Sequence, residues 1–406
     1  MQRKQLWTKI SGGLMSLFVL VNIISCGNIH HDDTGTVTSG WVSKKSGTTE
    51  DLRGIACKGT TWMAVGLGKD VIVSTNNGDT WTPKPSGTKE FLYDIACNDT
   101  AWVASGDSCT LTVSTNDGDT WKTKTMSENP NISCKGVACK GNTWMAVGLG
   151  EDVIVSTNNG DTWMKKKKDT KKWLCDVVYN GTAWVASGAG YTVTASQDDG
   201  KTWTEKTTIG ESTEQNCKGV ACKGNTWIAV GTSGVILVST DNGANWNNKN
   251  KVNYHIREGV AYNDSTWIAV GQDGSVIAST DNGEKWTTKS SGTTDYLLGV
   301  ACNGTTWVAV GDKGTVIVST DNGNTWATKS SGTGKKLFSV ACKGTTWVAV
   351  GENGIVIVST DNGNTWATKP SGTENDLYGV ACNGTAWIAA GKHGTVIVST
   401  DTALRQ

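Results

Sequence analysis

Tryptophan recurs along this chain at a spacing of about 40 residues. One series closes an eight-residue box typified by STDNGNTW and comprises Trp81, Trp121, Trp163, Trp203, Trp246, Trp286, Trp326 and Trp366. Trp41 stands 40 residues before the first of them. A second series keeps the same phase and comprises Trp62, Trp102, Trp144, Trp184, Trp227, Trp267, Trp307, Trp347 and Trp387. A fixed period of this length indicates a repeat architecture. The chain therefore holds nine repeats.

Each repeat has the pattern of four short strands. In the repeat that follows Trp286, segments rich in Val, Ile, Thr and Trp alternate at period two and are separated by Gly-containing turns. We expect strands at Leu297–Cys302, Thr305–Gly311, Gly314–Thr320 and Thr325–Ser330. Repeats of this length with four strands are typical of propeller blades. The predicted fold is all-β, a β-propeller of about nine four-stranded blades.

The two ends of the array are complementary. The chain enters through a fourth strand, Trp41–Ser46, and leaves through a third, Thr395–Thr400. We expect the N-terminal strand to complete the last blade and to close the ring. Nine blades exceed the usual four to eight, so two smaller rings are the alternative. No linker between repeats separates such rings, and a single propeller is preferred.

The box itself suits a hairpin turn. Its Asp can accept hydrogen bonds from backbone amides two residues on, its Gly supplies a positive φ, and its Trp can fold back over the turn. A calcium loop is the alternative, but Ca²⁺ needs six to eight converging oxygens. We therefore interpret the eight box tryptophans as structural.

The pattern S-x-D-x-G-x-x-W resembles the Asp-box, or BNR, repeat of sialidases, sortilin-type receptors and photosystem II assembly-factor-like propellers. The resemblance covers residues 41–406. It implies a blade type and leaves the chemistry open, since enzymes and receptors share the motif.

A lysine stands three residues after Trp41 and after each of the eight box tryptophans. Because the fourth strand is the outer edge of a blade, we interpret these lysines as protection against strand addition by other molecules. A polycationic binding surface is the alternative. The lysines are Lys44, Lys84, Lys124, Lys166, Lys206, Lys249, Lys289, Lys329 and Lys369.

The N-terminus has the organisation of an export signal. A basic start with Arg3, Lys4 and Lys9 precedes a short apolar run, Leu14–Ile24. Ile-Ile-Ser-Cys at 23–26 resembles the bacterial lipoprotein signal, which implies lipidation of Cys26. We expect a signal peptide at 1–25, a polar tether at 26–40 and the propeller at 41–406. The implied location is the bacterial cell envelope, anchored by lipid to the outer membrane or cell surface. An ordinary signal with an incidental Cys is the alternative.

Sequence variation between repeats points to one face as the ligand site. Loops between blades, and those joining second to third strands, share a face with the mouth of the central channel. The residue before each GVAC-like strand varies most, and two loops, 164–173 and 251–258, have unusual compositions rich in Lys, aromatic and Arg residues. Relaxed variation in solvated loops is the alternative. The candidate ligand-binding residues are Arg53, Tyr93, Lys135, Trp173, Tyr254, His255, Arg257, Glu258, Phe338 and Tyr378.

Most cysteines recur at one place, the end of the first strand, where Tyr179 and Tyr262 replace them in two blades. A position that accepts Cys or Tyr indicates packing. Cys109 and Cys134 fall outside this scheme, at a third and a first strand that should meet on one rim. Since exported proteins can oxidise thiols, we predict a Cys109–Cys134 disulfide.

The composition narrows the function. The formal net charge is zero, which gives no support for a nucleic-acid partner. The four histidines lack metal-ligand spacing, and we expect no cofactor and a monomer. The sialidase resemblance implies three arginines, a Tyr nucleophile with a Glu, and an Asp acid/base, but after residue 26 only Arg53, Arg257 and Arg405 remain. We therefore expect a non-enzymatic scaffold that binds a protein or glycan. A sialidase-like or other glycoside hydrolase is the alternative.

Overall fold

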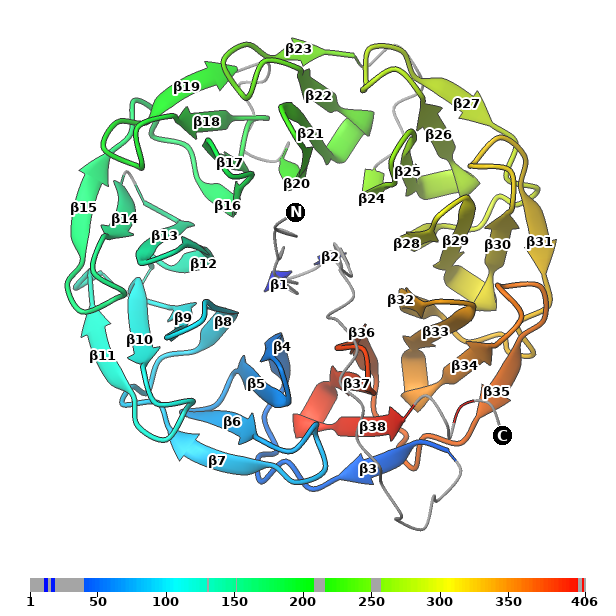
Figure 1. Cartoon of the computed structure of the whole chain (residues 1–406), viewed down its shortest axis with the longest axis horizontal. Helices are drawn as coiled ribbons and strands as arrows, with labels where there is room; N and C mark the ends of the chain where they lie inside the picture. Colours follow the sequence, from blue (N-terminus) through cyan, green and yellow to red (C-terminus); the bar gives the residue numbers. More distant parts are fainter. Residues whose placement is uncertain are drawn as a thin grey trace, which may run out of the picture.

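The computed structural model describes residues 11–13, 16–18, 40–129, 131–150, 152–207, 216–249, 257–400 and 404. Nine four-stranded antiparallel sheets stand around a common axis like the blades of a propeller (Figure 1). The nine-blade prediction is confirmed, and the alternative of two smaller rings is wrong. A separate two-stranded sheet, β1 (Ser11–Gly13) and β2 (Ser16–Phe18), lies inside the ring in Figure 1.

Eight blades place their strands from the axis outward in chain order, and in the last blade β36, β37 and β38 are followed by β3 as the outermost strand. The innermost strands are β4 (Leu52–Lys58), β8 (Leu92–Cys97), β12 (Cys134–Lys140), β16 (Leu174–Tyr179), β20 (Cys217–Lys223), β24 (Arg257–Tyr262), β28 (Leu297–Asn303), β32 (Leu337–Lys343) and β36 (Leu377–Cys382). The second strands are β5 (Thr61–Gly66), β9 (Trp102–Gly106), β13 (Thr143–Gly148), β17 (Trp184–Gly188), β21 (Thr226–Gly231), β25 (Trp267–Gly271), β29 (Thr306–Gly311), β33 (Thr346–Gly351) and β37 (Ala386–Gly391).

The outer half of each blade completes the sheet. The third strands are β6 (Asp70–Ser74), β10 (Thr110–Ser114), β14 (Asp152–Ser156), β18 (Val193–Ser196), β22 (Ile236–Ser239), β26 (Val276–Ser279), β30 (Val316–Ser319), β34 (Val356–Ser359) and β38 (Val396–Thr400). The outer strands are β7 (Thr82–Pro85), β11 (Lys122–Thr125), β15 (Met164–Lys167), β19 (Thr204–Thr207), β23 (Asn247–Asn248), β27 (Thr287–Lys289), β31 (Ala327–Lys329), β35 (Ala367–Lys369) and β3 (Val42–Lys44). Single 3₁₀ turns follow five second strands: η1 (Thr232–Gly234), η2 (Gln272–Gly274), η3 (Asp312–Gly314), η4 (Glu352–Gly354) and η5 (Lys392–Gly394).

The antiparallel order gives the ring two different faces. The box turns and the turns between first and second strands lie on one face, here called the box face. The loops between blades and the connections from second to third strands lie on the other, here called the loop face. Blades are numbered 1 to 9 in chain order from the sheet that contains β4.

The first and last parts of the chain close the ring. Strand β3 pairs antiparallel with β38, and Val42 lies opposite Val398. A hydrogen bond also joins the last blade to the first: Asn383 Nδ2 donates to the carbonyl of Gly59 at 2.9 Å. The predicted closure by the N-terminal strand is confirmed, and it removes the free ends of the array.

The hydrophobic core consists of separate clusters between neighbouring blades. All nine tryptophans of the second strands are at most 1% exposed. Trp307 on blade 7 shares a cluster with Ile268 and Val270 of blade 6. Four inner-strand thiols add blade-to-blade contacts: Cys97, Cys139, Cys302 and Cys342 donate to carbonyl groups of the preceding blade at 3.1–3.4 Å. These cysteines pack between blades.

The box forms a closed network of hydrogen bonds on the box face. In blade 7, Ser319 Oγ donates to Asp321 Oδ1 at 2.8 Å and accepts from the amide of Gly323 at 2.9 Å. The amide of Thr325 donates to Asp321 Oδ1 at 2.8 Å, and Trp326 Nε1 donates to the Gly323 carbonyl at 3.2 Å. The same indole bond forms at Trp81, Trp121, Trp246, Trp286 and Trp366. The buried Nε1 atoms of Trp163 and Trp203 have no partner among the described residues.

The box carboxylates make part of the stability pH-dependent. Hydrogen bonds from Thr325 lower the pKa of Asp321 to about 2. Because the pKa is lower in the folded state, this stabilisation is complete above about pH 4 and is lost as the pH falls towards 2. We expect Asp321→Asn to be less stable than the wild type by under about 1 kcal/mol at pH 6, since the group is exposed. Urea unfolding should show this difference shrinking as the pH is lowered to 2.5.

The first three boxes provide a control, because Asn76, Asn116 and Asn158 occupy the place of the Asp. The stability lost in Asn158→Ala should not change with pH between 6 and 2.5. A stability difference for Asp321→Asn that grows on acidification contradicts the assigned role of the carboxylate.

Candidate functional site

A β-bulge near the start of every inner strand creates the candidate site. In blade 1, Leu52 pairs with Gly66 and Gly54 with Val65, so the residue between them has no opposite partner. The same register shift occurs at all nine inner strands. A bulge re-aims the side chain of its extra residue. The fold therefore presents one side chain per blade at the inner edge of the loop face, at the position that varies most between repeats.

Five consecutive blades fill this position with aromatic and cationic side chains, which contact one another in two groups. Phe338 of blade 8 and Tyr378 of blade 9 have ring centroids 6.1 Å apart. The Arg53 guanidinium of blade 1 lies 5.8 Å from the Tyr378 ring. Lys135 of blade 3 places Nζ 3.1 Å from the ring centroid of Tyr93 on blade 2. We call these five residues the aromatic–cationic arc.

Arg53 provides the arc with unused hydrogen-bonding capacity. Its Nη2 forms an ion pair with Asp51 at 3.2 Å, and a quarter of the side chain is exposed. Its buried Nε has no hydrogen-bond partner among the described residues. The exposed quarter of the side chain, and not the buried Nε, is the part that an acceptor on a ligand can reach.

Asp107 links the two remaining members of the arc. The Tyr93 hydroxyl donates to Asp107 Oδ1 at 2.7 Å. Burial and this carboxylate raise the pKa of Tyr93, so the phenol stays protonated. Burial lowers the pKa of Lys135 to about 8, while Asp107 opposes the shift. Lys135 is therefore mostly protonated at neutral pH and loses its charge as the pH rises through about 8.

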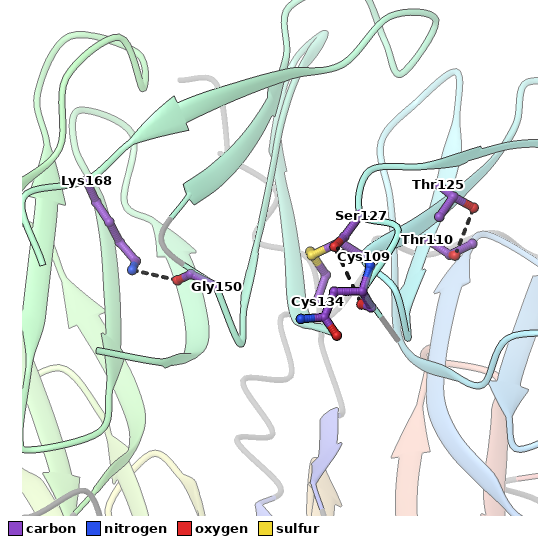
Figure 2. Close-up of a disulfide and its surroundings, with 8 residues drawn as sticks. Cys109, Thr110, Thr125, Ser127, Cys134, Gly150 and Lys168 are labelled. Carbon is purple, nitrogen blue, oxygen red and sulfur yellow. Dashed lines mark hydrogen bonds between the residues drawn. A yellow bond between two sulfur atoms is a disulfide. The ribbon is translucent and has the colours of Figure 1, made fainter. Parts of the chain in front are cut away.

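A disulfide holds this part of the arc in place. Cys109, in the connection from β9 to β10, is joined to Cys134 at the start of β12 (Figure 2). The bridge thus lies two residues from Asp107 and one residue from Lys135. It closes a separation of 25 residues, for which loop-closure entropy contributes about 3 kcal/mol. Thr110 and Thr125 hydroxyls, 3.3 Å apart, connect the same loop to the outer strand of its blade (Figure 2).

Trp173 lies on the same face but outside the arc. It precedes β16 and is 47% exposed, and Phe91 occupies the equivalent place before β8 at 45% exposed. The Trp173 carbonyl accepts a hydrogen bond from the amide of Ala189 at 2.9 Å, which fixes the backbone. Two exposed aromatic side chains therefore border the arc on the loop face.

The structure describes only two of the four predicted site residues at 254–258. Arg257 and Glu258 begin β24, and Glu258 takes the bulge position of blade 6. Tyr254 and His255 lie outside the described residues, as does Cys26. The sequence did not reveal Asp51 and Asp107, the carboxylates that pair with the arc. Asp51 lies in the loop before β4, and Asp107 directly follows β9. No sequence motif marks either residue as a partner of the arc.

Other kinds of site have less support in the described part of the chain. No group of three His, Cys, Asp or Glu side chains among these residues could hold a metal ion. In the same residues, no helix has the length and apolar character needed to cross a membrane. Two shallow depressions on the loop face, near Ser291 and Lys313, include none of the predicted site residues.

Comparisons with known proteins agree on the fold. The family model described as the DUF6242 beta propeller domain matches residues 175–298. A structure of YCF48 bound to D1 peptide aligns with a TM-score of 0.53 at 13% identity, over 89% of this chain and 96% of that chain. The computationally designed Ika8 protein aligns with a TM-score of 0.58 at 12% identity, over 75% of this chain and 95% of that chain. No curated protein matches the sequence. At these identities the likeness establishes a propeller fold.

Proposed function

We propose that this protein is a non-enzymatic binding propeller whose aromatic–cationic arc holds a segment of another protein. The observation that carries the proposal is that two contacting groups, Phe338–Tyr378–Arg53 and Tyr93–Lys135, occupy consecutive blades at one edge of the loop face. Aromatic and Arg side chains are the commonest anchors of protein interfaces. A polypeptide offers partners for these groups, namely carbonyl oxygens that accept hydrogen bonds from the Arg53 guanidinium and apolar side chains that pack on the rings.

The likeness to YCF48 supports this proposal by analogy. That propeller is described as bound to D1 peptide. A ring of blades of similar fold can thus bind a peptide, although the residues proposed to do so here are this chain's own. The glycoside hydrolase alternative has no comparable support.

We further propose that the protein acts outside the cytoplasm, anchored to the bacterial envelope by a lipid on Cys26. The order of basic, apolar and Ser-Cys residues at the N-terminus supports this placement. The Cys109–Cys134 disulfide is also consistent with an oxidising compartment, where such bonds persist.

Selection from a random peptide library displayed on phage tests the binding proposal. The full chain carrying Cys26→Ser serves as bait, and selected peptides are synthesised for affinity measurements. We expect Arg53→Ala combined with Tyr378→Ala to weaken peptide binding by about 30-fold, because both are central anchors. Lys122→Ala, an exposed substitution on β11, should change the affinity less than two-fold.

The outcome separates the alternatives. Selected peptides that bind equally well to the wild type and the arc variant place the site elsewhere and contradict the proposal. Failure to select any peptide, together with binding to a printed glycan array that the arc variant loses, makes the ligand a glycan instead.

A further inference from the structure

A repeated contact joins the outer rims of neighbouring blades. The lysine three residues after the box Trp reaches the sixth residue of the next box, and the contact distances are 2.6–2.8 Å. These pairs are Lys44–Asp79, Lys84–Asp119, Lys249–Glu284, Lys289–Asn324 and Lys329–Asn364. The lysines predicted to protect strand edges therefore also bind an acceptor on the next blade.

Between blades 3 and 4, lysines occupy both positions of this contact. The lysine of blade 3 is Lys166, and the sixth residue of the next box is Lys201. Strand β15 adds the exposed Lys165 and Lys167, and the following loop adds the exposed Lys171. Within the described chain, none of these five lysines forms an ion pair or a side-chain hydrogen bond. Positive charge is therefore concentrated at this junction, whereas Asp79, Asp119 and Glu284 neutralise the equivalent lysine at three others.

The loop that follows β15 has a fixed conformation. The buried Lys168 ammonium donates to the carbonyls of Gly150, Thr170 and Lys172 at 2.7, 2.8 and 3.0 Å, and Figure 2 shows the first of these bonds. In blade 1 the hydroxyl of Ser86 has the equivalent place and donates to the Lys69 carbonyl. Lys168 therefore fixes the conformation of the loop that carries the neighbouring lysines.

Large apolar side chains stand at both ends of the lysine run. Met164 is 45% exposed and Trp173 is 47% exposed. They are two of only four large apolar side chains that are exposed among the described residues, the others being Val42 and Phe91. We define the basic rim as Lys165, Lys167, Lys171 and Trp173, which run from β15 into the following loop on the loop face.

We propose that the basic rim docks the propeller on the surface of a bilayer that contains anionic phospholipids. Lysines near such a surface are attracted to its negative potential. Trp is favoured at the headgroup level, where its ring is partly buried and its N–H stays solvated. A soluble polyanion would use the lysines alone, whereas Trp173 suits insertion between headgroups. This contact uses neither the arc nor the proposed lipid on Cys26.

Vesicle co-sedimentation tests the proposal with the full chain carrying Cys26→Ser, so that no attached lipid contributes. The probes are vesicles of phosphatidylcholine with 30% phosphatidylglycerol, and vesicles of phosphatidylcholine alone. We expect binding only to the first, and its loss when NaCl is raised from 0.05 to 0.5 M, because the Debye length shortens. The triple variant Lys165→Gln, Lys167→Gln, Lys171→Gln should lower the partition coefficient roughly 100-fold, at about five-fold per lysine.

A matched triple variant provides the control. Lys89→Gln, Lys122→Gln and Lys124→Gln remove the same charge from exposed positions on the neighbouring blades and should lower partition less than five-fold. Trp173→Ala should lower it about ten-fold. The proposal is overturned if the wild type does not bind the anionic vesicles, or if the two triple variants lose binding equally. It is also overturned if Trp173→Ala has no effect while the basic rim lysines govern binding to heparin, which identifies a soluble polyanion as the partner. Unchanged urea unfolding shows that each variant is folded.

Discussion

Replacing Trp307 by alanine is expected to lower the free energy of unfolding by about 3–5 kcal/mol. The side chain is 0% exposed and fills the space between blades 6 and 7, against Val270 and Leu297. Its Nε1 also donates to Asn322 Oδ1 at 3.3 Å, so the substitution leaves both a cavity and a lost hydrogen bond. Trp307 lies between two sheets, and collapse of the site would need movement of a whole sheet. Urea unfolding followed by circular dichroism measures the loss.

Trp173→Ala is the matched control for this prediction. The same side chain is removed, but at a site that is 47% exposed. Its effect on stability should stay within about 0.5 kcal/mol. A loss below about 1 kcal/mol for Trp307→Ala would show that the cores between blades are not tightly packed.

Deleting residues 41–45 is expected to cost about 5 kcal/mol or more, the largest effect that we predict. The deletion removes β3 and with it Trp41, which is 6% exposed and packs with Ile397 and Leu404. It also leaves β38 as an open edge beside a buried cluster. An open edge pairs readily with another chain, so we expect oligomers in light scattering as well as a lower urea midpoint.

An equally long deletion at 31–35 provides the comparison, because it shortens the segment before β3 without removing any described strand. That variant should keep the stability and monomeric mass of the full chain. Equal behaviour of the two deletions would mean that β3 does not close the ring.

The sequence predicted the blades because each carries its own local signals. Strands predicted at Leu297–Cys302 and Thr325–Ser330 correspond to β28 (Leu297–Asn303) and β31 (Ala327–Lys329). The third and fourth strands each begin two residues later than predicted, and in the third strand the difference arises because η3 takes up Asp312–Gly314 and β30 begins at Val316. Alternation and turn residues locate a strand, but a single 3₁₀ turn has too few residues to leave a periodic signal.

The arc could be predicted only as separate residues. Variation between repeats identified Arg53 and Tyr378, but 325 positions separate them in the chain. Their contact depends on ring closure, which brings blade 9 beside blade 1, and on the bulge, which aims both side chains to the same edge. Neither the bulge nor the partner Asp107 has a sequence signature, since both arise from pairing between strands. The outer lysines likewise appeared as edge protection, because their acceptors lie on the next blade.

Closure of nine blades between β3 and β38 is the claim on which the arc and both faces depend, and a cross-link measures it most directly. Val42 and Val398 are register partners, whereas Ile397 lies opposite Ser43 and points to the other side of the sheet. Oxidation of Val42→Cys, Val398→Cys should give an intramolecular disulfide, seen by mass spectrometry of a non-reduced digest of the monomer. The control pair Val42→Cys, Ile397→Cys should give far less. Absence of the 42–398 link, or a link that joins two chains, would contradict the closed ring.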